Sequence, residues 1–154
     1  MIGGTALVYE EALDYPTPDA WCRLIQEHKV SIFGAAPTII RLFMKSDVLT
    51  AGYDLLSLRV LACTGEPINR EEWEWFFDKV GIRRCPVINV SGGTEAGGAI
   101  LGAAPVMALK PCTVGCPVPE FDADILDESG RPASEGGGDS GVCSCKGRPT
   151  RRKR

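Results

Sequence analysis

The sequence has little of what several common kinds of active site require. Histidine occurs once, at His28 on an expected helix face, and we expect its ring to pack there instead of serving as the base of a catalytic triad. No apolar run reaches the roughly 20 residues that a membrane-spanning helix needs. Residues 1–8 lack the basic region and the long apolar stretch of a secretory leader. These absences argue against triad hydrolases and membrane-spanning proteins, and they favour a cytoplasmic globular chain.

Cysteine is present seven times, but in no paired Cys-x-x-Cys arrangement. Cys22, Cys63 and Cys85 lie in apolar stretches, so we expect free thiols in a reducing cytoplasm instead of a disulfide framework. A zinc site is the alternative, although Pro111 and Pro117 interrupt the ligand spacing that tight metal-binding turns need. Its ligands would be Cys112, Cys116, Cys143 and Cys145.

Charge is distributed unevenly along the chain. The formal net charge is −3, yet the last nine residues hold six basic side chains and no acidic one, so the remainder is strongly acidic. An acidic body does not suggest nucleic-acid binding, and a localisation or nucleic-acid signal in Arg151–Arg154 is the alternative to a solvated basic tail. Glycine and serine dominate 134–141. We therefore expect one domain over 1–132 and a disordered tail at 133–154.

Apolar patterns typical of helices and of strands alternate up to about residue 98. Thr17-Pro18-Asp19 has the features of a helix start, and so does Asn69 followed by Glu71 and Glu72. This alternation predicts an α/β fold with a parallel βαβ sheet flanked by helices. Frequent glycine and proline beyond residue 100 predict a small β element there. The expected helices cover 18–29, 37–44 and 69–80, the last ended by a C-cap at Gly81. The expected strands cover 30–33, 58–63, 86–90 and 121–126, and a turn is expected at 127–130.

Two loops follow expected strands at the edge where open parallel sheets bind ligands. The first, at 64–67, is a tight turn whose backbone could lie flat against an aromatic base. The second, at 91–98, has adjacent glycines that let the backbone approach an anion. Its Thr94 can donate a hydrogen bond to a phosphate oxygen, and its Glu95 can hold a hard cation such as Mg²⁺. Two ordinary turns between strands and helices are the alternative when either loop is taken alone.

Two common phosphate-binding motifs are excluded for the second loop. No Gly-Lys-Ser or Gly-Lys-Thr follows it, so the loop is not a P-loop. Its glycines also lack the Gly-x-Gly-x-x-Gly spacing of a dinucleotide-binding fold. They are Gly92, Gly93, Gly97 and Gly98.

Three ordered motifs together resemble the adenylate-forming acyl-CoA synthetases, and the acetyl-CoA synthetase branch most of all. Further similarity lies at 14–18, 73–75 and 110–111, and the resemblance runs from about residue 3 to residue 132. It identifies 1–132 as part of the large N-terminal, AMP-binding domain of such an enzyme. The motifs are Ala36-Pro37-Thr38, Gly65-Glu66-Pro67 and Asn89-Val90-Ser91-Gly92-Gly93-Thr94-Glu95.

The resemblance implies a two-step reaction and a site for its nucleotide. A carboxylic acid attacks the α-phosphate of ATP, giving an acyl-adenylate and pyrophosphate, and CoA then displaces AMP to form the thioester. Gly65, Glu66 and Pro67 would frame the adenine. Thr94 would contact phosphate and Glu95 would bind Mg²⁺, which makes these two the candidate catalytic residues. The adenosine and the α-phosphate would be lined by Asn89, Val90, Ser91, Gly92 and Gly93 together with Thr94.

The sequence also departs from the family pattern. Acetate-specific relatives carry an aromatic residue at the position of Gly92, so glycine there predicts open space and an acyl group larger than acetyl. The family's phosphate loop rich in serine, threonine and glycine does not occur in the sequence. Neither do the aspartate that holds the ribose and the small C-terminal domain with its catalytic lysine.

These departures predict that the chain alone forms no acyl-adenylate and that the missing enzyme segments are its partners. The sequence after Pro132 is first rich in glycine and then basic, and a shifted or truncated reading frame explains it most simply. A non-catalytic nucleotide-binding or interaction fragment that retains only the fold is the alternative function. An enzyme that adenylates an aryl or amino acid is a weaker alternative.

Overall fold

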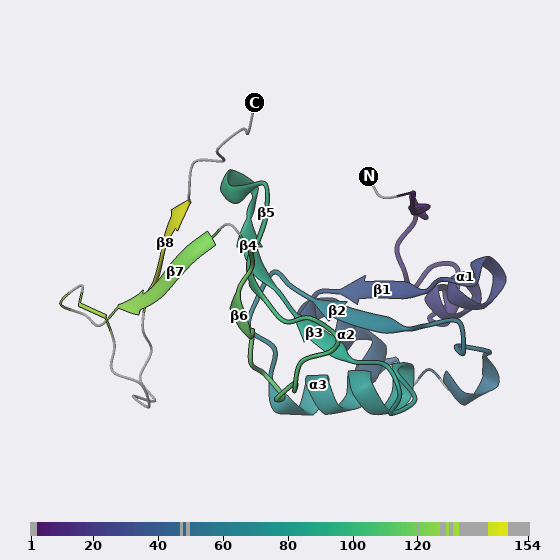
Figure 1. The fold of residues 1–154 in the computed structure, drawn as a ribbon. Coiled ribbons are helices and arrows are strands. Elements are labelled where there is room, and N and C mark those ends of the chain that lie inside the picture. Colours follow the sequence, from purple (N-terminus) through teal and green to yellow (C-terminus); the bar gives the residue numbers. More distant parts are fainter. Residues whose placement is uncertain are drawn as a thin grey trace. The chain divides into compact units, whose positions relative to one another are not determined.

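The computed structural model describes residues 3–46, 48, 50–119, 121–126, 129, 131–132 and 142–147, the last six by their backbone alone. The chain separates into two compact units, 1–87 and 88–154. Figure 1 labels the helices and strands of both units. No helix in the described ranges is long and apolar enough to cross a membrane.

The helices of the first unit begin where the sequence provides helix-starting residues. α2, Pro37–Lys45, has proline at its first position, where the missing N–H leaves no helical hydrogen bond unmade. α3, Arg70–Trp75, begins with a capping box formed by Asn69 and Glu72 and continues into a π-helical turn, Phe76–Val80. α1, Ala20–His28, starts later than its sequence predicts. Its N-cap residue is Asp19, whose carboxylate accepts a hydrogen bond from the Tyr53 hydroxyl and does not cap the helix.

Three strands form one sheet in the order β1-β2-β3, and the boundary between the two units falls within β3 (Figure 1). β1, Ile32–Ala35, pairs in parallel with β2, Val60–Cys63, and β3, Val87–Asn89, lies next to β2. β1 continues through Gly34 instead of ending there, because Gly34 pairs with Ala62. The predicted α/β fold with a parallel sheet and flanking helices is confirmed.

The core of the first unit joins aromatic rings from helices and strands. The ring centroids of Trp21 and Phe43 are 4.5 Å apart, and those of Trp21 and Phe33 are 5.6 Å apart. Burying an apolar side chain of this size stabilises the fold by about 1.5–3 kcal/mol. The buried members of this core are Trp21, Cys22, Ile25, Ala35, Ile40, Phe43, Leu55, Leu58, Leu61, Cys63, Ile68, Trp73, Phe76, Val80, Cys85 and Val87.

The second unit consists of antiparallel strands. β4, Ser91–Gly93, and β5, Gly98–Gly102, form a hairpin around a 3-10 turn, Thr94–Ala96. β6, Cys116–Pro117, pairs with β5, and β7, Phe121–Leu126, pairs with β8, Val142–Gly147. The small β element predicted after residue 100 is therefore present, and β7 falls where the sequence places a half-exposed strand.

One part of the expected tail differs in the structure. Residues 142–147 form β8, inside the range 133–154 that the sequence predicts to be disordered. All six pair with β7, from Phe121 opposite Gly147 to Leu126 opposite Val142. Such pairing depends on a partner strand, which local composition does not reveal. The rest of that range, and most of the turn expected at 127–130, lie outside the described residues, so the domain boundary at Pro132 stays a prediction.

Candidate functional site

The first candidate loop leaves the end of β2 as a tight, exposed turn. Gly65 has a φ of +102°, a conformation that residues with a side chain rarely adopt, which explains the glycine. Glu66 and Pro67 are exposed, whereas Ile68 is buried and Asn69 begins α3. The turn is therefore a short exposed span between two fixed elements of the first unit.

The Glu66 carboxylate points away from the turn toward α2. Its Oε1 atom accepts hydrogen bonds from the Thr38 backbone N–H at 2.7 Å and from the Thr38 hydroxyl. Arg41 Nη2 donates to both carboxylate oxygens, at 3.1 and 3.2 Å. These hydrogen bonds, those from Thr38 above all, hold the pKa of Glu66 below its ordinary value.

Glu66 also caps the N-terminus of α2, which the helix's own N-cap residue cannot do. The N-cap residue of α2 is Ala36, whose methyl side chain cannot accept a hydrogen bond. The Glu66 carboxylate bonds the Thr38 N–H in the first turn, where backbone donors are unsatisfied and the helix dipole favours negative charge. The sequence motifs name Thr38 and Glu66 separately and do not reveal this contact. The signal that could have revealed it is the absence of a capping side chain at Ala36.

Arg41 connects the turn to the start of α3. Its Nη1 atom donates to Glu72 Oε1 at 3.1 Å while its Nη2 atom holds Glu66. Glu72 in turn accepts from the Asn69 backbone N–H at 2.6 Å and from the Asn69 amide at 3.3 Å. Burial alone would raise the pKa of Glu72, but the bonds from Asn69 and Arg41 outweigh it and hold this pKa below its ordinary value. Motif reasoning misses Arg41 and the role of Glu72.

The second candidate loop is the β4–β5 hairpin of the second unit. Asn89 is buried with 6% of its surface exposed, and Val90 is half-buried. Ser91, Thr94 and Glu95 are exposed at or near the hairpin tip, where backbone and hydroxyl groups can meet a ligand. This loop connects two antiparallel strands, so the alternative of an ordinary turn between a strand and a helix does not hold for it.

Gly92 has a different role from the one that its sequence position suggests. The register of β4 and β5 shifts between Ser91 and Gly92. A Cβ placed on Gly92 would lie 2.2 Å from the Gly98 carbonyl oxygen and 2.9 Å from the Ala99 Cα. Glycine is needed here because the two strands approach closely, and backbone fills the space beside it. The open space predicted beside Gly92 is therefore absent. The prediction of an acyl group larger than acetyl rested on that space and loses this support.

Glu95 is the candidate metal ligand, and its surroundings limit what it can hold. A Cβ on Gly93 would lie 2.5 Å from Glu95 Oε2, so this carboxylate folds back over the Gly93 backbone. The described residues contain no group of three or more metal-ligating side chains. Mg²⁺ often binds through one or two carboxylates plus the phosphates of its substrate. A single exposed carboxylate fits an ion of that kind, delivered together with a nucleotide.

The structure thus brings together some of the predicted residues. Glu66 contacts Thr38 and Arg41 in the first unit, and these contacts fix the turn that contains Gly65 and Pro67. The stretch Asn89–Glu95 is continuous and belongs to the second unit. Each loop is formed within its own unit.

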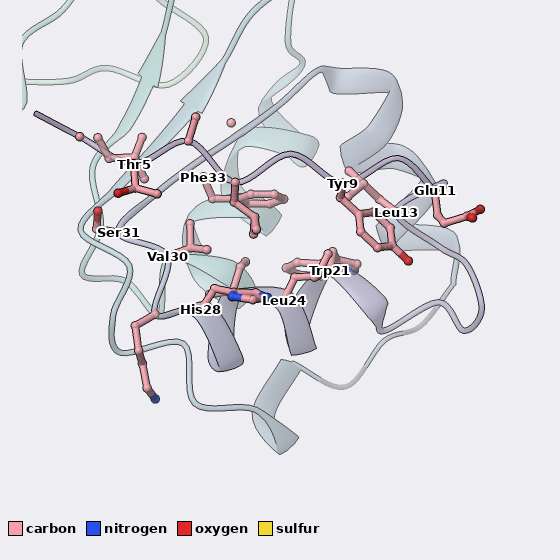
Figure 2. Close-up of a pocket in the computed structure, with 17 residues that line it drawn as sticks. Thr5, Tyr9, Glu11, Leu13, Trp21, Leu24, His28, Val30, Ser31 and Phe33 are labelled. Carbon is pink, nitrogen blue, oxygen red and sulfur yellow. The ribbon is translucent and has the colours of Figure 1, made fainter. Parts of the chain in front are cut away.

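A cavity of about 860 Å³ lies in the first unit between the segment 4–13 and the elements α1 and β1. Figure 2 shows Trp21, Leu24 and Phe33 lining it. None of the predicted nucleotide-binding residues lines this cavity. His28, which the sequence predicts to pack on its helix, is exposed and forms part of the lining, so that prediction is wrong.

The described cysteines differ strongly in exposure between the units. Cys22, Cys63 and Cys85 are buried free thiols of the first unit, and burial raises the pKa of Cys22 to about 12 and that of Cys63 to about 11. Cys112 and Cys116 of the second unit are exposed free thiols. The side chains of Cys143 and Cys145 lie outside the described structure, so the alternative zinc set stays a prediction.

Comparison with protein families gives one family match that covers most of the chain. The model described as "AMP-binding enzyme" matches residues 1–146. The acetyl-coenzyme A synthetase of Chromobacterium violaceum is 43% identical over 139 residues, 88% of this chain and 21% of that protein. The acetyl-coenzyme A synthetase of Pyrobaculum aerophilum is 39% identical over 140 residues, again 88% of this chain and 21% of that protein. The chain thus spans about a fifth of the length of these curated relatives.

Solved structures of two CoA ligases have a similar fold. A benzoate CoA ligase from Burkholderia xenovorans aligns with a TM-score of 0.67 at 26% identity, over 84% of this chain and 25% of that chain. An anthranilate CoA ligase in complex with anthranoyl-AMP aligns with a TM-score of 0.73 over 86% of this chain and 24% of that chain. Its identity of 21% shows the similarity of fold alone.

Proposed function

The chain belongs to the AMP-binding enzyme family, and we propose that it supplies part of the nucleotide site of an AMP-forming acyl-CoA synthetase. The observation that carries this proposal is that the family match over 1–146 includes both candidate loops. Acetyl-coenzyme A synthetases with about 40% identity support the same enzyme class. The activity of the whole protein is part of the proposal, because the chain covers 21% of these relatives.

The proposed reaction uses a carboxylic acid, ATP and CoA as substrates. A carboxylate oxygen attacks the α-phosphorus of ATP, and the bond to pyrophosphate breaks. The sulfur of CoA then attacks the acyl carbonyl carbon, and AMP leaves as the thioester forms. The protein's main physical task in the first step is to hold the phosphates and stabilise the negative charge that develops on them.

The described residues suit parts of this task. The backbone of Gly65, Glu66 and Pro67 would lie against the adenine, while the Thr94 hydroxyl would donate to a phosphate oxygen. Glu95 would hold Mg²⁺, which neutralises phosphate charge when it is bound. Asn89, buried at the end of β3, would help to keep the following stretch in place beside the adenosine.

We expect the chain by itself to bind adenine nucleotides without forming acyl-adenylate. We therefore propose that the isolated chain binds nucleotide but does not catalyse the reaction. The remaining enzyme segments are its proposed partners. We also propose a cytoplasmic location, and we expect no nucleic-acid partner because the body of the chain is acidic.

Titration of AMP into the purified chain, followed by calorimetry and by amide NMR shifts, tests this proposal. We expect saturable binding that shifts the amides of both loops and weakens in Thr94→Val, while GTP binds less tightly. Ser129→Ala, outside both loops, serves as the control variant. A folded chain that shows no saturable AMP binding would contradict the proposal, and ATP–pyrophosphate exchange by the chain would contradict the expected lack of catalysis.

A further inference from the structure

We infer that Glu66 and Arg41 are positioning residues, which anchor the Gly65–Pro67 turn to α2 so that its backbone, and not the Glu66 carboxylate, meets the ligand. This inference rests on the proposed function for the identity of the ligand, an adenine nucleotide. The anchoring itself is a property of the chain without ligand, so the two can be tested separately.

The Glu66 carboxylate is already occupied by protein donors. Oε1 accepts from the Thr38 N–H, the Thr38 hydroxyl and Arg41 Nη2, and Oε2 accepts from Arg41 Nη2 as well. A carboxylate offers about four lone-pair sites in total. Turning Glu66 toward an adenine would break a charge-assisted network and uncap α2 at the same time.

Arg41 fixes the turn at two points with one rigid group. Nη2 holds Glu66 in the middle of the turn, and Nη1 holds Glu72, which bonds the Asn69 N–H where the turn enters α3. The planar guanidinium can bond two carboxylates in a fixed geometry, whereas a lysine ammonium is a single point charge on a flexible stem. The span from Glu66 to Asn69 is therefore tied to α2 through one side chain.

The opposite side of the turn is open. A Cβ placed on Gly65 would meet nothing within 4 Å. Glycine is therefore needed at this position for its φ of +102°, and not because neighbouring atoms leave no room for a side chain. With the Glu66 side chain drawn toward α2, the peptide groups are what the turn presents on that open side. Peptide groups can stack on a flat base and bond its edge, which suits an aromatic ligand without negative charge.

The first experiment measures the turn without ligand. Glu66→Gln keeps the shape of the side chain but removes its charge, and Arg41→Gln removes the guanidinium. The control is Arg83→Gln, which removes an arginine that holds Asp78 through two bonds of 2.9 Å elsewhere in the first unit. We expect amide hydrogen exchange at Thr38, whose N–H donates to the Glu66 carboxylate, to accelerate about tenfold in the first two variants, the size expected for losing hydrogen bonds to a charged group.

The Thr38 amide supplies a spectroscopic signature of the anchor. Its proton is donated to the Glu66 carboxylate, so its NMR resonance should move upfield in Glu66→Gln and stay in place in Arg83→Gln. Circular dichroism establishes whether each variant is folded. If Arg41→Gln unfolds because the buried Glu72 loses its partner, Glu66→Gln carries the test, since it leaves the Arg41–Glu72 pair intact.

The second experiment measures AMP binding by the same variants. We expect Glu66→Gln and Arg41→Gln each to weaken AMP binding about tenfold, and the double variant to bind no more weakly than the poorer single variant, because both changes release one anchor. A Thr38 amide whose hydrogen exchange rate and resonance both stay as in wild type would overturn the inference. So would additive losses of AMP affinity, which indicate that Glu66 contacts the ligand by itself. A wild-type chain that binds no AMP while its turn responds as expected supports the anchor and contradicts the proposed function.

Discussion

The two units of this chain are stabilised in different ways. Every member of the main buried core lies in the first unit, where helices and strands bury aromatic rings together. The second unit, as far as it is described, consists of antiparallel strands whose side chains are mostly exposed or half-exposed. Side-chain packing holds the first unit, and backbone pairing holds the second.

Each candidate loop is stabilised in the same way as the unit that contains it. The Gly65–Pro67 turn is fixed by side chains through Thr38, Arg41 and Glu66. The Ser91–Gly98 hairpin is fixed by strand pairing and by glycines that let the strands approach closely. We therefore expect the first loop to respond to side-chain changes and the second loop to respond to backbone changes.

The largest expected effect comes from opening the core of the first unit. Phe43→Ala removes a fully buried ring that stacks on Trp21, and we expect the free energy of unfolding to fall by about 3–5 kcal/mol. Leu42→Ala, at an exposed position of the same helix, should cost less than about 1 kcal/mol. Urea denaturation measures both, and equal losses would contradict the importance of this core.

A smaller effect is expected from the hairpin of the second unit. Gly92→Ala places a methyl group 2.2 Å from the Gly98 carbonyl oxygen, which must separate the strands at a cost of about 1–3 kcal/mol. Gly98→Ala is the matched control, because a methyl group there meets nothing within 4 Å. Amide protection in β4 and β5 is the measurement. Protection that survives Gly92→Ala as well as it survives Gly98→Ala would show that close approach does not fix this loop.

Thiol labelling compares the two units in one experiment. The thiols of Cys22 and Cys63 are buried and have a raised pKa, about 12 and 11, whereas Cys112 and Cys116 are exposed. We expect a maleimide to label the exposed pair at least about tenfold faster, because only an accessible thiolate reacts. Peptide mass spectrometry gives the rates. Rapid labelling of Cys22 in the native chain would mean that the first unit opens easily, and urea supplies the fully labelled reference.

The smallest expected effect is a local response to acid. The folded-state pKa values of Glu66 and Glu72 lie below 4.5, the ordinary glutamate value, so their contribution to stability is complete above 4.5 and is lost as pH falls through the lowered values. We expect protection of the Thr38 amide, which donates to Glu66, to fall over this acidic range in the wild-type chain, and to fall less in Glu66→Gln. Identical pH profiles for both chains would show that Glu66 does not hold the turn.

Much of this fold follows from local sequence. Proline at the start of α2 and the Asn69–Glu72 capping box at the start of α3 are local signals, because helix ends depend on neighbouring residues. The glycine of the Gly65–Pro67 turn is a local signal too, since a positive φ favours it. Ordered motifs, and not any single loop, made the family recognisable.

Other features depend on residues far apart in the sequence, and only the tertiary structure decides them. Asp19 bonds Tyr53 instead of capping α1, and Glu66 caps α2 across 28 residues of chain. Gly92 is required by the close backbone of β5, and β8 exists because β7 pairs with it. The physical reason is the same in each case. Local propensity determines where an element can begin, but the partner of a polar group or a strand edge is determined by the fold that brings it near.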